Sequence, residues 1–192
     1  AFNVNNSSTM MYGINTYNGA TITNNIIGGT GANALISTGS GTGLYGIFYG
    51  GTSSGTNITG NSLNTLTASG GGGAQVIGID VSSSSASSAV IQNNTILSLS
   101  SNGTSYSNWG ILSSGSSATI SGNLINGITV SGVHTGTYYL YGIAANGAST
   151  TVTLNTIKNL SVTGSGSTLQ VNGIYTSNGT GYVVTNNAIS NL

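Results

Sequence analysis

Three side chains of the 192-residue chain carry or can carry a charge near neutral pH: Asp80, Lys158 and His134. Enzymes that hydrolyse polysaccharides use a pair of carboxylic acids, and elimination needs a positioned basic group. A single carboxylate side chain therefore excludes a two-carboxylate mechanism within this chain. The three residues also occupy different positions of the sequence repeat described below. We expect each to be an isolated, solvated side chain, and we predict that the protein is not an enzyme.

The composition excludes several other kinds of site. The chain has no cysteine, so it cannot form a disulfide, a thiolate zinc site or a thiol nucleophile. One carboxylate argues against a calcium site, and no Ser/His/Asp set has the spacing of a triad. We expect no cofactor and no metal. A single basic residue cannot neutralise a row of phosphates, which excludes charge-driven nucleic-acid binding. No apolar run approaches the roughly 20 residues of a membrane span, so we expect no membrane insertion.

Aromatic residues are the remaining candidates for ligand contact, because their rings can stack on sugars. Strict alternation of side chains along a strand places the aromatic position of the repeat on the same face as the isoleucine two residues later. We therefore predict an aromatic stack inside the fold, with an outward row of rings as the alternative. The aromatic residues at this position are Tyr12, Tyr45, Trp109 and Tyr141. The candidates for exposed glycan contacts are Tyr138, Tyr139, Tyr106 and Tyr49.

An internal repeat positions these residues, and self-similarity at a fixed period is typical of solenoids and related arrays. The pair Gly-Ile, preceded in five copies by an aromatic or apolar residue, recurs at six positions whose glycines lie 31 to 33 residues apart. Six repeats of about 32 residues cover the whole chain. The glycines of this column are Gly13, Gly46, Gly78, Gly110, Gly142 and Gly173.

A second pattern in every repeat is an apolar residue, an asparagine three positions later and another apolar residue two positions after that. An amide in an apolar interior costs a few kcal/mol (~2–7) if it has no partner. Asparagines stacked in register can instead bond to one another, as they do in cross-β assemblies. We therefore predict an internal ladder formed by Asn25, Asn61, Asn94, Asn123, Asn155 and Asn187.

The segments between these anchors predict strands. The apolar runs are short and rich in Ile and Val, and the intervening Gly, Ser, Thr and Asn residues are poor helix formers. One such unit buries little surface, and only stacking on its neighbours pairs all its backbone groups. We predict an all-β fold: a parallel β-helix (β-solenoid) of about six coils, one for each repeat. Residues 1–192 form a single solenoid segment, with neighbouring coils about 4.8 Å apart.

The runs at residues 91–96 and 184–189, with Tyr-Gly-Ile at 141–143, resemble parallel β-helix repeats of the pectate-lyase type. They are most similar to the Ser/Thr/Asn-rich versions in large secreted proteins of Bacteroidetes that the type IX system exports. The resemblance covers all six repeats and implies a right-handed helix and an extracellular, cell-surface location. The repeats here are longer than the family's shorter coils, so we expect protruding loops. The acidic and basic residues of the family's enzymes are missing.

Neither end of the chain shows the polar or helical cap with which solenoids protect their terminal strands. We expect both ends to be covered, either by flanking repeats of the same polypeptide or by head-to-tail copies of this chain. A repetitive, nearly uncharged rod without catalytic groups predicts a structural segment of a secreted surface fibre or adhesin stalk. The alternative is a carbohydrate-binding module that uses exposed Tyr and Asn residues. An enzyme would need catalytic residues from flanking sequence.

An ice-binding surface is a further hypothesis, because pairs of threonines separated by one residue occur at positions 21/23, 65/67 and 151/153. These pairs do not recur in one register of the repeat, which weighs against this hypothesis.

Overall fold

The computed structural model of the chain describes residues 2–4, 10–29, 34–39, 41, 43–52, 55–82, 88–104, 107–163, 165–177 and 179–192. At residues 2–4, 134–136, 166 and 167 it describes the backbone alone. The described residues form β-strands and no helix, which confirms the all-β prediction. The described residues therefore include no helix that could cross a membrane.

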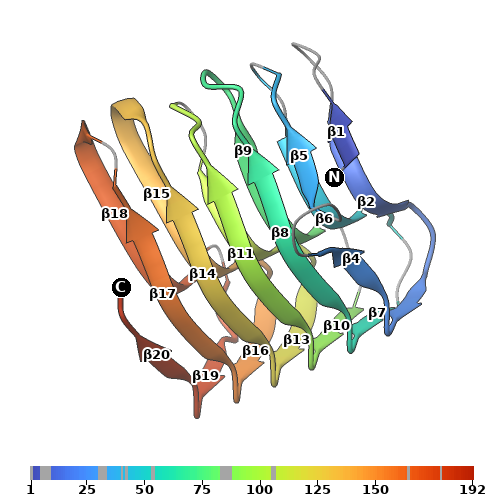
Figure 1. The fold of residues 1–192 in the computed structure, drawn as a ribbon. Helices are drawn as coiled ribbons and strands as arrows, with labels where there is room; N and C mark the ends of the chain where they lie inside the picture. Colours follow the sequence, from blue (N-terminus) through green and yellow to red (C-terminus); the bar gives the residue numbers. More distant parts are fainter. Residues whose placement is uncertain are drawn as a thin grey trace.

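The strands form three parallel sheets, and Figure 1 shows the strands of successive repeats side by side from the blue N-terminal end to the red C-terminal end. Sheet A consists of β1 (Phe2–Val4), β4 (Ile26–Gly28), β5 (Leu35–Ser37), β8 (Ser62–Ala68), β11 (Thr95–Ser101), β14 (Leu124–Val130), β17 (Thr156–Val162) and β20 (Ala188–Ser190). Sheet B consists of β2 (Met11–Thr16), β6 (Gly43–Tyr49), β9 (Gln75–Val81), β12 (Asn108–Ser113), β15 (Val133–Ala145) and β18 (Ser165–Thr176). Sheet C consists of β3 (Thr21–Thr23), β7 (Thr56–Thr59), β10 (Ser88–Gln92), β13 (Ser117–Ser121), β16 (Ser149–Thr153) and β19 (Val183–Thr185).

Each coil passes through sheet B, sheet C and sheet A in turn, and each sheet pairs a strand with its equivalent in the next repeat. The register is like on like: in sheet C, Ile58 pairs with Ile91, and Ile91 pairs with Ile120. In the first coil, β4 and β5 pair with the two halves of β8, so the residues between them are an insertion in one sheet A strand. The predicted β-solenoid with one repeat in each coil is confirmed.

Apolar side chains from all three sheets fill the interior. Ile47 of sheet B, Ile58 of sheet C and Leu63 of sheet A are completely buried, as are their equivalents in the next three coils. Complete burial of such a side chain contributes roughly 1.5–3 kcal/mol. Because each file continues from coil to coil, stacking extends one continuous core along the solenoid.

The glycine column faces the second anchor pattern across this core. A Cβ atom added to Gly46 would lie 2.3 Å from a methyl carbon of Leu63, and one added to Gly142 would lie 2.5 Å from a methyl carbon of Ile157. The same close approach recurs at every glycine of the column. Glycine is therefore required here so that the apolar residue two positions after each ladder asparagine can pack against the opposite backbone.

Candidate functional site

The six predicted ladder asparagines lie in one file at the corner between sheets C and A, which confirms the ladder. In the first five coils the side-chain Nδ2 donates to the Oδ1 of the asparagine in the next coil, with N–O distances of 2.9–3.0 Å. The same Oδ1 accepts the backbone N–H of the asparagine in the preceding coil at 2.9–3.0 Å. Each carboxamide oxygen therefore satisfies two donors of the neighbouring coil.

The Nδ2 group also reaches the coil on the other side. Nδ2 of Asn123 donates to the carbonyl oxygen of Ile91, in the preceding coil, at 2.9 Å. The equivalent bond occurs in the other four coils that have a preceding coil, with distances of 2.8–2.9 Å. One amide thus joins three consecutive coils. The four central asparagines are only 1% exposed, so the bonds among them are shielded from water.

The residue before each ladder asparagine has a left-handed backbone, with φ between 55° and 69°. Asparagine and glycine adopt this conformation readily, whereas other residues lose roughly 1–2 kcal/mol in it. Five of the six positions hold one of these two residues, and Leu154 is the exception. An Asn or Gly directly before the ladder residue is visible in the sequence, and it could have predicted the sharp corner as well as the ladder. The six positions are Asn24, Gly60, Asn93, Gly122, Leu154 and Asn186.

The three ionisable candidates do not form a site. Asp80 lies in β9 of sheet B, whereas Lys158 lies half-buried in β17 of sheet A. The backbone of His134 is part of β15, and its side chain lies outside the described part of the structure. Among the described residues, no three His, Asp or other metal-binding side chains come together.

Asp80 is not the solvated side chain that we expected, because it is only 4% exposed. Its strand is central in sheet B, where Asp80 pairs with Phe48 on one side and Leu112 on the other. Burial raises the pKa of the Asp80 carboxyl to about 6, and a hydrogen bond from the Ser82 hydroxyl to Asp80 Oδ1, at 2.6 Å, opposes that rise. The carboxylate has no described basic partner and no second carboxylate, so it lacks the surroundings of a general acid–base pair.

Two of the four tyrosines expected to be exposed lie in the core. Tyr49 is 0% exposed and Tyr138 is 2% exposed, because strand alternation places them on the same face as Ile47 and Leu140. The expectation of exposure is wrong for both. The Tyr138 hydroxyl accepts a hydrogen bond from Nδ2 of Asn108, and burial raises the pKa of Tyr138 above its usual range. Tyr106 lies outside the described residues.

The aromatic column lies on the outer face of sheet B, so the prediction of an internal stack is wrong. The core includes Leu44 and Ile47 but not Tyr45. The Tyr45 ring instead stacks on Tyr12 at 5.0 Å between ring centroids and contacts the half-buried Phe48 at 5.6 Å. Because both Gly46 and Ile47 face inward, the strict alternation on which the prediction rested is interrupted at the glycine.

A second aromatic cluster occupies the same outer face nearer the C-terminal end. Tyr141 stacks on Trp109 at 6.0 Å and on Tyr139 at 5.6 Å, and it contacts Tyr175 at 5.2 Å. Burial in this cluster raises the pKa of Tyr141 to about 12. Tyr139, the fourth tyrosine proposed for glycan contact, is thus half-buried on the outer face. Phe48 and Tyr175 were not predicted to belong to these clusters, because neither stands at the aromatic anchor position of its repeat.

Comparison with known proteins adds nothing on this face. Neither a family profile, nor a curated protein, nor a solved structure matches the chain. The likeness to pectate-lyase-type repeats therefore stays a prediction from the residues at the two anchors.

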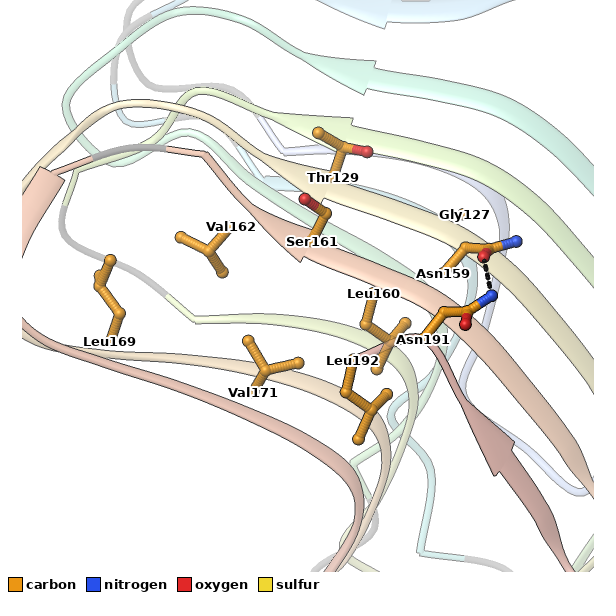
Figure 2. Close-up of a pocket in the computed structure, with 10 residues that line it drawn as sticks. All are labelled: Gly127, Thr129, Asn159, Leu160, Ser161, Val162, Leu169, Val171, Asn191 and Leu192. Atoms are coloured by element: carbon orange, nitrogen blue, oxygen red, sulfur yellow. Dashed lines mark hydrogen bonds between the residues drawn. The ribbon is translucent and has the colours of Figure 1, made fainter.

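An open hollow lies at the C-terminal end of the solenoid, where the core is not covered by another coil. Figure 2 shows Leu160, Val162, Val171 and Leu192 around it. Apolar files that are closed in the inner coils end here. Ile125 is completely buried in its coil, whereas its equivalent in the last coil, Ile189, is 45% exposed. The hollow is therefore the exposed end of the core.

Proposed function

We propose that the chain is a structural, non-catalytic segment of a secreted cell-surface fibre or adhesin, in which coils stack along a filament or stalk. The observation that carries the proposal is the asparagine corner, where one buried amide joins three consecutive coils. Each further repeat therefore adds the same set of buried hydrogen bonds between coils. It suits a rod whose task is to keep its shape.

The near-absence of charge supports the same role. One acidic and one basic residue in 192 leave little charge for salt to screen. Surface charges, which ordinarily stop strand edges from pairing, are also nearly absent. The rod is therefore held by apolar packing and neutral hydrogen bonds, which salt screens little.

The end hollow fits the stacking that this function requires. Val184 and Ile189 of the last coil stay 46% and 45% exposed, in files that are closed wherever another coil follows. A further coil with the same two anchor patterns would cover them, whether it came from flanking repeats or from another copy of the chain. The partner we propose is therefore more of the same solenoid.

End-to-end association of the purified chain tests this role. We expect rods longer than one chain by electron microscopy, and a mass in sedimentation that grows with concentration. Placing lysine at Val184 and Ile189 adds charge to the exposed end and should give single particles. Thr95→Lys, on the outer face of sheet A in the middle of the solenoid, is the matched control and should still associate. Compact monomers of the unmodified chain at every concentration would contradict the proposal.

A carbohydrate-binding module is the second candidate, and the outer aromatic face of sheet B favours it. Tyr175 and Tyr17 are 41% and 59% exposed at the two aromatic clusters. Trp109 is the single tryptophan of the chain, so its fluorescence reports on one cluster directly. A glycan that binds there should shift this fluorescence, and Tyr175→Ala should weaken the binding. A glycan screen without any binder would remove this candidate.

A further inference from the structure

The outer face of sheet C differs from the other two faces of the solenoid, because short hydroxyl side chains dominate it. Residues two positions apart in each strand point outward, on either side of the buried Ile or Val. Like-for-like pairing arranges them in two files. The first file is Thr21, Asn57, Val90, Thr119, Thr151 and Val183. The second file is Thr23, Thr59, Gln92, Ser121, Thr153 and Thr185.

Two of the three threonine pairs share one register of the repeat, contrary to the expectation from the sequence. Thr21/Thr23 and Thr151/Thr153 are aligned in sheet C, although they are four coils apart. Only the pair at positions 65/67 belongs elsewhere, in sheet A. Seven of the twelve outward positions of sheet C are threonine, one is serine and two are valine, which has the shape of threonine. The outer face of sheet A lacks this uniformity, since the aligned positions there hold Leu97, Asn126 and Lys158.

The two files form a regular two-dimensional array. Neighbouring strands lie about 4.8 Å apart, and outward residues of one strand are roughly 6.6 Å apart. The paired strands of sheet C follow one another without a register shift. Threonine is also stiff at χ1, so its methyl and hydroxyl groups keep defined positions. The hydroxyls of Thr153 and Thr185 lie 3.2 Å apart, within hydrogen-bond distance, along their file.

We propose that the outer face of sheet C binds ice. Hydroxyl groups on this array would anchor water molecules, while the methyl groups between them hold those waters in cage-like positions. The two spacings are close to oxygen repeats on the surface of an ice crystal, so the anchored layer can merge with the lattice. None of the twelve positions is charged or aromatic, which disfavours phosphate, peptide or sugar-stacking partners. The proposal does not depend on the fibre role, because a single chain carries the whole array.

Ice recrystallisation and thermal hysteresis measure this activity directly. We expect the unmodified chain to slow the growth of ice grains and to shape single ice crystals. Thr151→Tyr places a bulky ring in β16, one strand from the edge of the array, and should abolish most of the effect. Thr119→Lys, in the more central β13, should do the same through a charge. Thr95→Tyr changes an outward threonine of sheet A and should leave the activity intact.

Circular dichroism shows whether each variant is folded. If Thr151→Tyr does not fold, Thr119→Lys provides the test. The proposal is overturned if the unmodified chain has no more effect on ice than an unrelated protein of equal mass. It is also overturned if Thr95→Tyr reduces the effect as strongly as the folded array variants do. Rod formation without any effect on ice would leave the fibre role standing and remove this inference alone.

Discussion

Two groups of asparagines are linked from coil to coil, one buried and one exposed. They show how strongly burial determines what a hydrogen bond contributes to stability. The inner ladder links Asn123 to Asn155 by an amide–amide bond of 2.9 Å. A group of outer asparagines beside sheet A is linked by bonds from Asn159 to Asn126 at 2.7 Å and from Asn191 to Asn159 at 2.9 Å. The bonds are alike in chemistry and length. Only the inner amides are buried, and only they hold backbone groups of two other coils.

This difference explains why one group extends through every coil and the other does not. A buried donor without a partner costs about 1–3 kcal/mol of stability, whereas an exposed donor can form a hydrogen bond with water instead. Asparagine is therefore required at every inner position. On the outer face the position in register with Asn126 holds Leu97 in one neighbouring coil and Lys158 in the other, and Asn159 reaches Asn126 from the next position along its chain. No asparagine is needed there in every coil, because nothing depends on a buried amide.

The strongest test of this comparison is Asn123→Ala. The substitution removes the acceptor of two Asn94 donors and the donor to the Ile91 carbonyl, all of them buried. With about 1–3 kcal/mol for each unpaired group, we expect the free energy of unfolding to fall by about 4 kcal/mol. Chemical denaturation followed by circular dichroism measures it.

Asn126→Ala is the matched control in the same coil. It removes one exposed amide–amide bond, and we expect a loss of about 0.5 kcal/mol or less, as for other surface substitutions. Equal losses in the two variants would show that burial does not separate the two groups.

Asp80 extends the comparison from amides to charges, with an effect of intermediate size. Its pKa is about 6 in the folded chain and near 3.8 in the unfolded one. Between these values the folded chain holds a proton that the unfolded chain has lost, so stability is greatest below pH 4 and falls as the pH rises to 6. At about 1.4 kcal/mol for each pKa unit, the fall is about 3 kcal/mol.

Unfolding curves between about pH 3.5 and 7.5 measure this dependence. Asp80→Asn should flatten the profile and stabilise the protein at about pH 7. Lys158→Gln, at the half-buried basic residue of sheet A, should leave the profile unchanged. A rise in stability from about pH 4 to 6 in the unmodified chain would contradict the burial of an unpaired carboxylate.

The solenoid and its ladder could be predicted because both depend on spacing along the chain. A buried amide needs an identical partner in the next coil, so Asn123 and Asn155 had to recur at the repeat length. The glycine column was found in the same way. Its partner across the core was not predicted, since nothing in the sequence alone shows that Gly46 opposes Leu63.

The properties of the outer faces depend on neighbours from other coils, and there the predictions failed. Tyr45 was placed inside because the alternation gave no sign that Gly46 and Ile47 both face inward. Asp80 was expected to be solvated, but Phe48 and Leu112, about one repeat away on either side, enclose it. These errors share one cause. The register between strands determines which residues of neighbouring coils lie side by side, and the sequence anchors predict that register only at the anchor positions.

Thr150→Val tests the buried and exposed hydroxyls of a single strand. Thr150 is 1% exposed and its hydroxyl has no hydrogen-bond partner among the described residues, whereas the neighbouring Thr151 points outward. Valine keeps the shape of threonine and removes the unpaired group, so we expect a gain of about 1 kcal/mol in the free energy of unfolding. Thr151→Val should change it by less than about 0.5 kcal/mol. Thermal melts of the two variants measure the change in stability that each substitution causes.

An effect of similar size, about 1 kcal/mol, is expected at the one corner that departs from the pattern. Leu154 directly precedes Asn155 with a φ of 58°, where its equivalents are asparagine or glycine. Because the left-handed conformation costs such a residue roughly 1–2 kcal/mol, Leu154→Asn should stabilise the protein by about 1 kcal/mol. Leu154→Ala retains the Cβ atom and should bring no gain, which separates backbone strain from the loss of an exposed leucine. Asn93→Ala makes the opposite change two coils away and should destabilise by a similar amount. If Leu154→Asn and Leu154→Ala melt at the same temperature, the corner tolerates any residue, and the ladder asparagine alone determines its shape.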